Sequence, residues 1–424
     1  MWKDKIIAVF KFKDLRKRII FVLVMLVIFR IGASIPIPGV DAQRLSSFFN
    51  ANQFFGLMNI FTGGALERLS IMMVGIAPYI TATIIMQLLT LVFPRLEEMY
   101  KEEGEAGQKR FNQYARLLTV PLAILQSFAM LKLLQSQKVI VGFTISDIII
   151  SVITITGGAV FIMWIGELIT ERGIGNGISL LIFAGIIADM PSSIRQAFLT
   201  WEPSQLISWI IFFLSAFFIM VSVVIINEAR RNVPISYAKR VRGNKVYGGV
   251  QTYLPMMINP AGVLPIIFAL SIMILPSMFG PILSKSSISV IAFIGSGLNF
   301  ILKKQLIYGI IYFILVVLFT FFYTAVTFDP DNISENLQKM GGFIPGIRPG
   351  KNTSNFLRHI LNRVLSVGAI FLGIIAIMPS IIQNATGITV FGFFVGGTAL
   401  LIIVAVVLET VDQIQGEFEV RSYE

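Results

Sequence analysis

Long apolar segments recur along the chain, and they constrain its fold more than any other feature. A helix needs about 20 mostly apolar residues to cross the hydrocarbon core of a bilayer. Lipid cannot pair backbone N–H and C=O groups, and the segments lack the alternating pattern of a barrel, so we expect α-helices. Ten segments qualify: residues 19–35, 69–93, 115–134, 147–168, 174–190, 205–227, 254–280, 306–327, 362–382 and 388–408.

The composition agrees with an all-α integral membrane protein. Of the 424 residues, 55% are hydrophobic and 13% are charged, whereas about a quarter of the residues in a soluble domain are charged. The chain contains no cysteine, which excludes disulfides and thiolate metal sites. Its single histidine, His359, lies between Arg358 and Arg363, and we interpret it as a solvated residue of a basic loop.

The distribution of Lys and Arg predicts the orientation. If the first span starts in the cytosol, 24 of the 34 basic residues fall on the cytosolic side and eight on the outer side, while Arg30 and Arg116 lie within spans. This excess predicts that both termini are cytosolic. A cleaved signal peptide ending near Ala33 is the alternative for the N-terminus. The net charge of +11 is compatible with nucleic acid binding, but a basic cytosolic face and anionic lipids account for it better.

Two predicted spans are interrupted by glycine and proline in corresponding positions. They are the second and the seventh, so each is second in its own half of five. Such pairs are typical of inverted repeats with a working site between the halves, although glycine and proline are also common in membrane helices generally. The interrupting residues are Gly75 and Pro78 in the second span, and Pro260, Gly262 and Pro265 in the seventh.

Residues 54–70 are too short and too polar to span a membrane, yet too apolar for an ordinary loop. A short re-entrant or cavity-filling helix fits this composition, because irregular backbone survives at membrane depth only inside protein or beside water. An interfacial amphipathic helix is the alternative.

No constellation for catalysis or ion coupling is evident. The predicted spans carry charge mainly at their ends, and no GxxxxGK[ST] nucleotide motif occurs. This disfavours a secondary transporter or an intramembrane enzyme, and we predict no catalytic centre and no cofactor. Ile76 and Ile80 are four residues apart, as are Ile178 and Ile182. Such pairs could form a dry constriction, but they could equally reflect ordinary helix packing.

The long basic loops, at about 228–253 and 328–361, are the other informative feature. They could dock the phosphate backbone of a ribosome or an acidic partner protein. A flank that merely sets topology is the alternative.

Several motifs give the chain a specific resemblance to the SecY family of protein-conducting channels. They are FRIGASIPIPG (29–39), NIFTGGALERLSI (59–71), GIAPYITATIIMQLL (75–89), GELITERGIGNGISLLIFAGI (166–186), SYAKRVRGNKVYGG (236–249) and GGFIPGIRPG (341–350).

The resemblance implies ten helices in two pseudo-symmetric inverted halves, residues 1–200 and 201–424, around an hourglass pore. Unfolded secretory polypeptides would pass through the pore, and apolar segments would leave sideways into lipid through a lateral gate. The gate would be formed by the second, third, seventh and eighth spans. A short plug within about 54–70 would fill the outer funnel at rest.

The resemblance also assigns the site residues. The pore ring would be Ile76, Ile80, Ile178, Ile182, Ile267 and Ile402; the plug would be Leu57, Met58, Asn59, Ile60, Phe61, Thr62, Gly63, Gly64, Ala65 and Leu66; the polar pair of the gate would be Gln87 and Asn259; and the docking surface would include Lys239, Arg240, Arg242 and Arg348.

The implied partners are the small membrane subunits SecE and SecG, the SecA motor, the translating ribosome, signal-sequence-bearing preproteins and anionic lipids. The implied location is the bacterial cytoplasmic (inner) membrane.

Overall fold

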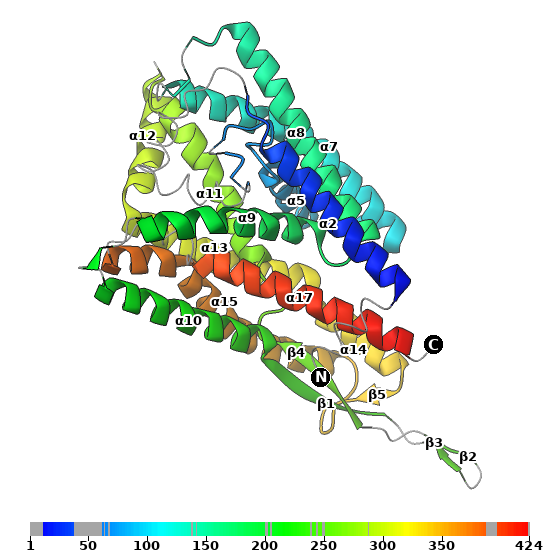
Figure 1. Ribbon diagram of the computed structural model, residues 1–424. Helices are drawn as coiled ribbons and strands as arrows, with labels where there is room; N and C mark the ends of the chain where they lie inside the picture. The colour runs from blue at the N-terminus through cyan, green and yellow to red at the C-terminus, as the bar shows by residue number, and fades with distance from the viewer. Residues whose placement is uncertain are drawn as a thin grey trace.

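A computed structural model of the chain is a long bundle of helices with a small β-sheet at one end (Figure 1). The structure describes residues 12–37, 62, 64–66, 68–136, 139–140, 142–199, 202–203, 206–237, 240–242, 245–247, 251–286, 288–386 and 397–422.

The first half of the chain forms helices from six segments. Most of them agree with the predicted spans, but α7 begins about ten residues before the predicted 115–134. Its first turns are polar, so hydropathy did not assign them to the span. The helices are α2 (Lys13–Ala33), α5 (Ala77–Thr90), α6 (Pro94–Lys101), α7 (Gly104–Ser136), α8 (Ile145–Arg172) and α9 (Gly177–Leu199).

The described residues of the second half add seven helices and five short strands. The helices are α10 (Leu206–Glu228), α11 (Leu264–Leu283), α12 (Ser289–Lys303), α13 (Gln305–Thr327), α14 (Pro330–Lys339), α15 (Lys351–Thr386) and α17 (Gly397–Ser422), and the strands are β1 (Arg230–Tyr237), β2 (Arg240–Arg242), β3 (Lys245–Tyr247), β4 (Gln251–Met257) and β5 (Gly342–Phe343).

Among the described residues, seven helices are long and apolar enough to cross a membrane, and the bent pair α5–α6 would make eight. Two further predicted spans are not counted among these seven. The start of α2 is rich in Lys and Arg, and the apolar stretch of α9 whose side chains are described, Gly177–Ser192, is shorter than a span. A chain of this kind is a multi-pass membrane protein, and the count of ten spans stays a prediction.

The two interrupted spans begin later than predicted. Residues 68–76 are turns, so the second predicted span is helical only within α5. The seventh predicted span, 254–280, is wrong at its start, because residues 254–257 belong to strand β4 and the helix begins at Leu264. Only residues 258–263 separate the apolar strand from the apolar helix, and they are mostly apolar too, so hydropathy alone does not separate the two elements.

The basic loops contain secondary structure that the sequence did not predict. Strand β1 pairs with both β4 and β5 in antiparallel register, and β2 and β3 form a separate hairpin. The hairpin projects away from the helices in Figure 1. Val233 and Ile235 of β1 are buried, so alternate residues of the strand face the protein.

One large apolar cluster joins the two halves of the chain. It draws buried side chains from α2, α5, α8 and α9, and from α10, α11, α13, α15 and α17. A second cluster lies where the segment before α5 meets α7, α8 and α11. The contact between α11 and the N-terminal half therefore lies at the centre of the molecule, and this is where the predicted site falls.

Candidate functional site

Helix α5 is reached through a glycine-dependent turn. Gly75 has φ +61°, a left-handed conformation that favours glycine. Ile76 then caps the helix with φ −89° and ψ −2°, and Pro78 occupies its first turn. N–H groups in the first turn of a helix have no hydrogen-bond partner within the helix. Proline, which lacks an N–H, is therefore favoured there. The turn places Ile76 and Ile80 together at the N-terminal end of α5.

Helix α11 is reached in the same way. Gly262 has φ +59°, Val263 caps the helix with φ −93° and ψ −9°, and Pro265 lies in the first turn. Ile267 follows Gly262 by five residues, as Ile80 follows Gly75. The correspondence supports the predicted internal repeat.

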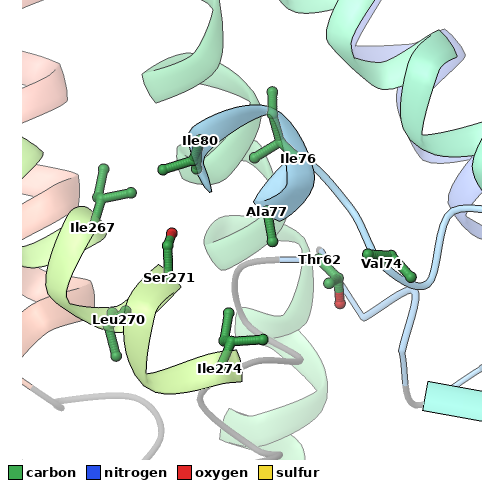
Figure 2. Close-up of a pocket in the computed structure, with 9 residues that line it drawn as sticks. All are labelled: Thr62, Val74, Ile76, Ala77, Ile80, Ile267, Leu270, Ser271 and Ile274. Atoms are coloured by element: carbon green, nitrogen blue, oxygen red, sulfur yellow. The ribbon is translucent and has the colours of Figure 1, made fainter. Parts of the chain in front are cut away.

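A small cavity lies between these two helices (Figure 2). Its volume is about 20 Å³, which is room for roughly one water molecule. The side chains of Ile80 and Ile267 extend toward each other across it. The lining residues are almost all apolar: Thr62, Val74, Ile76, Ala77, Ile80, Ile267, Leu270, Ser271 and Ile274.

The remaining members of the predicted ring come from α9 and α17. Ile182 and Ile402 are fully buried in the same cluster as Ile76, Ile80 and Ile267, and Ile178 packs against that cluster. A methyl group placed on Gly166 of α8 would lie 3.6 Å from both Ile76 and Ile178, so these two side chains lie against the same glycine. The structure thus brings all six isoleucines into one apolar cluster, drawn from four helices.

Only the last part of the predicted plug lies within the described residues. Leu57, Met58, Asn59, Ile60, Phe61 and Gly63 lie outside them. Thr62, Ala65 and Leu66 are buried, and the Leu66 N–H donates to Thr62 Oγ1 at 3.2 Å. Because Thr62 lines the cavity, the end of the predicted plug adjoins the isoleucine cluster.

Gly64 in this segment packs tightly against α9. It has φ +76°, and an added Cβ would lie 2.6 Å from Asp189 Oδ1. Asp189 Oδ1 lies 3.6 Å from Arg30 Nη2 of α2. Only a glycine therefore fits at this position without movement of the ion pair.

The predicted gate residues Gln87 and Asn259 are both buried. Asn259 Nδ2 donates to Asn227 Oδ1 at 2.9 Å and to the Gly262 carbonyl at 3.1 Å. Gln87 Oε1 and Asn259 Oδ1 find no hydrogen-bond partner among the described residues. Each amide oxygen is therefore open to a further partner, and their role in a gate stays a prediction.

The structure adds polar residues that the sequence analysis missed. Gln126 and Ser127 of α7 are fully buried, and neither side chain has a hydrogen-bond partner within the described part of the chain. A lone glutamine in the middle of an apolar span was the available signal. Helix α7 contacts both α5 and α11.

A charged network also ties three helices of the first half together. Arg116 Nε of α7 donates to Glu167 Oε1 of α8 at 2.5 Å, and Tyr79 of α5 donates to the same oxygen at 3.4 Å. Glu167 lies near the end of the predicted span 147–168. It is an ion-pair partner with only 14% of its side chain exposed.

The predicted docking residues belong to the segments that contain the β strands. Arg348 is exposed in the turn before α15, where its carbonyl accepts a hydrogen bond from Thr353 Oγ1 at 3.0 Å. Arg240 and Arg242 belong to strand β2, and only their backbone is described, while Lys239 lies outside the described residues.

Comparisons with known proteins agree on one family. The SecY family model matches residues 70–411. The chain is 42% identical to the "Protein translocase subunit SecY" of Mycobacterium tuberculosis (strain CDC 1551 / Oshkosh), over 97% of this chain and 96% of that protein. It is 40% identical to the protein of the same name from Thermotoga maritima, over 98% and 95% of the two chains.

Solved structures show the same fold at low sequence identity. One is described as "The structure of a protein conducting channel", with a TM-score of 0.66 and 18% identity, covering 94% of this chain and 92% of the other. Sec61 in the canine ribosome-channel complex aligns with a TM-score of 0.63 at 18% identity, with the same coverage.

Proposed function

The chain belongs to the SecY family, and from this membership we propose that it is the channel through which unfolded secretory polypeptides cross the membrane. The observation that carries the proposal is the isoleucine cluster. Four helices from both halves contribute to it, and the interrupted helices α5 and α11 meet there.

Aliphatic side chains suit a seal of this kind. A narrow apolar constriction excludes ions because water does not wet it. Branched aliphatic side chains can also fit around many different side chains without holding any of them tightly. We propose that Ile76, Ile80, Ile178, Ile182, Ile267 and Ile402 line this constriction.

The plug and the gate would control the constriction. Residues 57–66 would fill the outer side at rest, and Gly64 would let the chain turn there. Helix α11 contacts both α5 and α7, so the two halves are closed against each other along the predicted gate. Parting of these contacts would open a path to lipid for apolar segments, with Gln87 and Asn259 as the polar residues of the gate.

The chain would supply the path, and its partners would supply the energy for transport. We propose a cytoplasmic-membrane location with both termini in the cytosol, the SecA motor or a translating ribosome as the source of force, and SecE and SecG as neighbouring subunits. Two of the matched structures, canine Sec61 and yeast Ssh1, are ribosome complexes. The β2–β3 hairpin projects away from the helices (Figure 1), and Arg348 is exposed; both would be accessible to such partners, and anionic lipids would contact the basic cytosolic face.

Site-specific crosslinking tests the proposal. A photoreactive residue would replace Ile80 or Ile267 while a secretory precursor is stalled midway through membranes containing this chain. We expect crosslinks to the precursor from both positions, and their loss when the signal sequence is deleted. Phe217 of α10, which is 68% exposed on the outside of the bundle, is the matched control and should not crosslink.

The opposite result would be equally informative. If the precursor is engaged but neither Ile80 nor Ile267 crosslinks to it, the isoleucines are packing residues and the polypeptide path lies elsewhere.

A further inference from the structure

Helix α12, which the sequence analysis did not predict, has an apolar face that no other part of the described chain covers. It connects the membrane-spanning helices α11 and α13. With 15 residues it is about 22 Å long, which is too short to cross a bilayer core of about 30 Å. It must therefore lie near the membrane boundary where α11 ends and α13 begins. Figure 1 places it at the end of the bundle opposite the β strands.

The side chains of α12 divide into three sectors. One sector packs on the protein and includes Gly295, which is buried. A second is exposed and apolar, and a third is a narrow exposed edge with Ser289 and Ser296. The exposed apolar side chains are Val290 (69%), Phe293 (79%), Ile294 (53%) and Phe300 (52%).

The packed sector holds α12 firmly on the end of α11. Asn299 Nδ2 donates to Ser284 Oγ at 3.1 Å and to the Gly280 carbonyl at 3.3 Å. Gly295 lies so close to the last turn of α11 that an added Cβ would be 2.2 Å from the Ser284 nitrogen. The orientation of the helix is thus fixed, and the exposed apolar sector cannot rotate inward.

Basic residues flank the apolar sector. Lys285 precedes α12 and Lys304 follows it, and both are exposed. Lys304 Nζ lies 4.5 Å from the centre of the Phe300 ring, so the ammonium group lies over the last aromatic residue of the apolar sector, at the C-terminal end of α12. An apolar face bordered by lysines is the arrangement of a helix lying in a lipid interface, with ammonium groups at phosphate level.

We propose that α12 binds the phospholipid surface of the outer leaflet, with Val290, Phe293, Ile294 and Phe300 among the acyl chains and Lys285 and Lys304 against headgroup phosphates. Because α12 is fastened to α11, it anchors the outer end of this helix to the membrane surface. The proposal rests on the membrane-spanning fold and, for the choice of the outer leaflet, on the proposed orientation, but not on the proposed channel function.

Spin labelling can test the proposal directly, because the chain contains no cysteine. Single variants Phe293→Cys and Ser296→Cys would be labelled with a nitroxide in the full chain, in vesicles of phosphatidylcholine and phosphatidylglycerol. Power saturation then compares collisions with oxygen, which concentrates in lipid, and with a water-soluble nickel chelate. Phe217→Cys gives the lipid reference, and Glu335→Cys in α14 gives the water reference.

We expect the oxygen-to-nickel ratio at Phe293 to approach that at Phe217, and to exceed the ratio at Ser296 several-fold. A ratio at Phe293 equal to that at Glu335 would overturn the proposal. A label at Phe293 that neither reagent reaches would also overturn it, because the face would then be covered by protein. Reversing both charges, Lys285→Glu with Lys304→Glu, should lower the ratio at Phe293 in phosphatidylglycerol-rich vesicles. An unchanged ratio would exclude the phosphate contacts.

Discussion

Helices α5 and α11 begin with nearly the same backbone and end in different surroundings. Each follows a left-handed glycine, Gly75 or Gly262, and each has a proline in its first turn. The capping residues Ile76 and Val263 differ by only a few degrees in φ and ψ. In both, the carbonyl of the cap accepts hydrogen bonds from the residues three and four positions later. The shared G-x-x-P spacing accounts for the shared turn.

The contacts of the two helices differ in kind. Tyr79 of α5 joins the Arg116–Glu167 ion pair, which links it to α7 and α8. The entry to α11 is held by a neutral amide pair, Asn259 with Asn227. Charge-assisted hydrogen bonds are roughly twice as strong as neutral ones. We therefore expect α5 to move with α7 and α8 as one body, and α11 to be the more easily displaced side of the gate.

The largest effect is expected from Glu167→Ala, which would remove the centre of the α5 network. Arg116 would lose its main partner, and loss of one member of a buried pair costs about 3–5 kcal/mol. Since 39% of the Arg116 side chain is exposed, we expect a decrease of about 3 kcal/mol in the free energy of unfolding. Denaturant titration of the purified chain in detergent micelles measures it.

The double variant Glu167→Ala with Arg116→Ala is the control for this prediction. It should lose less stability than the sum of the two single variants, because no charge is then left without its partner. A loss for Glu167→Ala no greater than that for Asn259→Ala would show that α5 is not the more firmly held helix.

Alanine at the two glycines probes the same comparison at the backbone. Both substitutions force a left-handed residue, which costs about 1–2 kcal/mol. A Cβ on Gly75 would also lie 3.0 Å from Thr62 Cγ2, whereas one on Gly262 would have no atom within 4 Å among the described residues. We expect losses of about 2 kcal/mol for Gly75→Ala and about 1 kcal/mol for Gly262→Ala, in the same titration. Equal losses would mean that Thr62 moves aside without cost.

These glycines also illustrate what the sequence could predict. Interrupted spans at Gly75 and Gly262 followed from residue type alone, because the conformational freedom of glycine and the restriction of proline are local properties. Strand β4 was not predicted, because its pairing with β1 depends on residues about twenty positions away. Between its apolar residues and α11 lie only six residues, of which Asn259 is the single polar side chain, so hydropathy assigned the strand residues to the span.

The candidate site was less predictable from residue type and spacing than the helix entries. The spacing of Ile76 and Ile80 fitted ordinary packing as well as a constriction, and only the family resemblance joined them to Ile267 and Ile402. Tertiary structure decides which helix faces meet, and a helical period does not specify the partner. The Arg116–Glu167 pair was missed for the same reason, since its residues lie on different helices.

A smaller effect is expected from Asn259→Ala. The variant removes the donors to the Asn227 side chain and the Gly262 carbonyl. A neutral hydrogen bond contributes about 0.5–1.5 kcal/mol net, and an unpaired buried group adds to the loss. We expect about 1.5 kcal/mol, measured by denaturant titration. Asn227→Ala is the matched control and should cost a similar amount. A loss of about 3 kcal/mol would contradict the idea that α11 is the more weakly fastened helix.

The smallest effect is expected where the two helix entries differ by one methyl group. Ile76→Val gives α5 the capping residue of α11, and both positions are almost completely buried, at 3% and 4% exposure. Ile-to-Val substitutions in cores cost about 0.5–1.5 kcal/mol, and we expect about 0.5–1 kcal/mol here, because the matching turn at Val263 shows that valine is compatible with this backbone. If Ile76 also lines the constriction, vesicles containing the variant should leak ions faster than wild type. The reciprocal Val263→Ile should leave leakage unchanged, since Val263 is not among the residues lining the cavity. Equal leakage from both variants would mean that Ile76 does not seal the constriction. Ile76 would then be only a helix-capping residue whose extra methyl group fills the core.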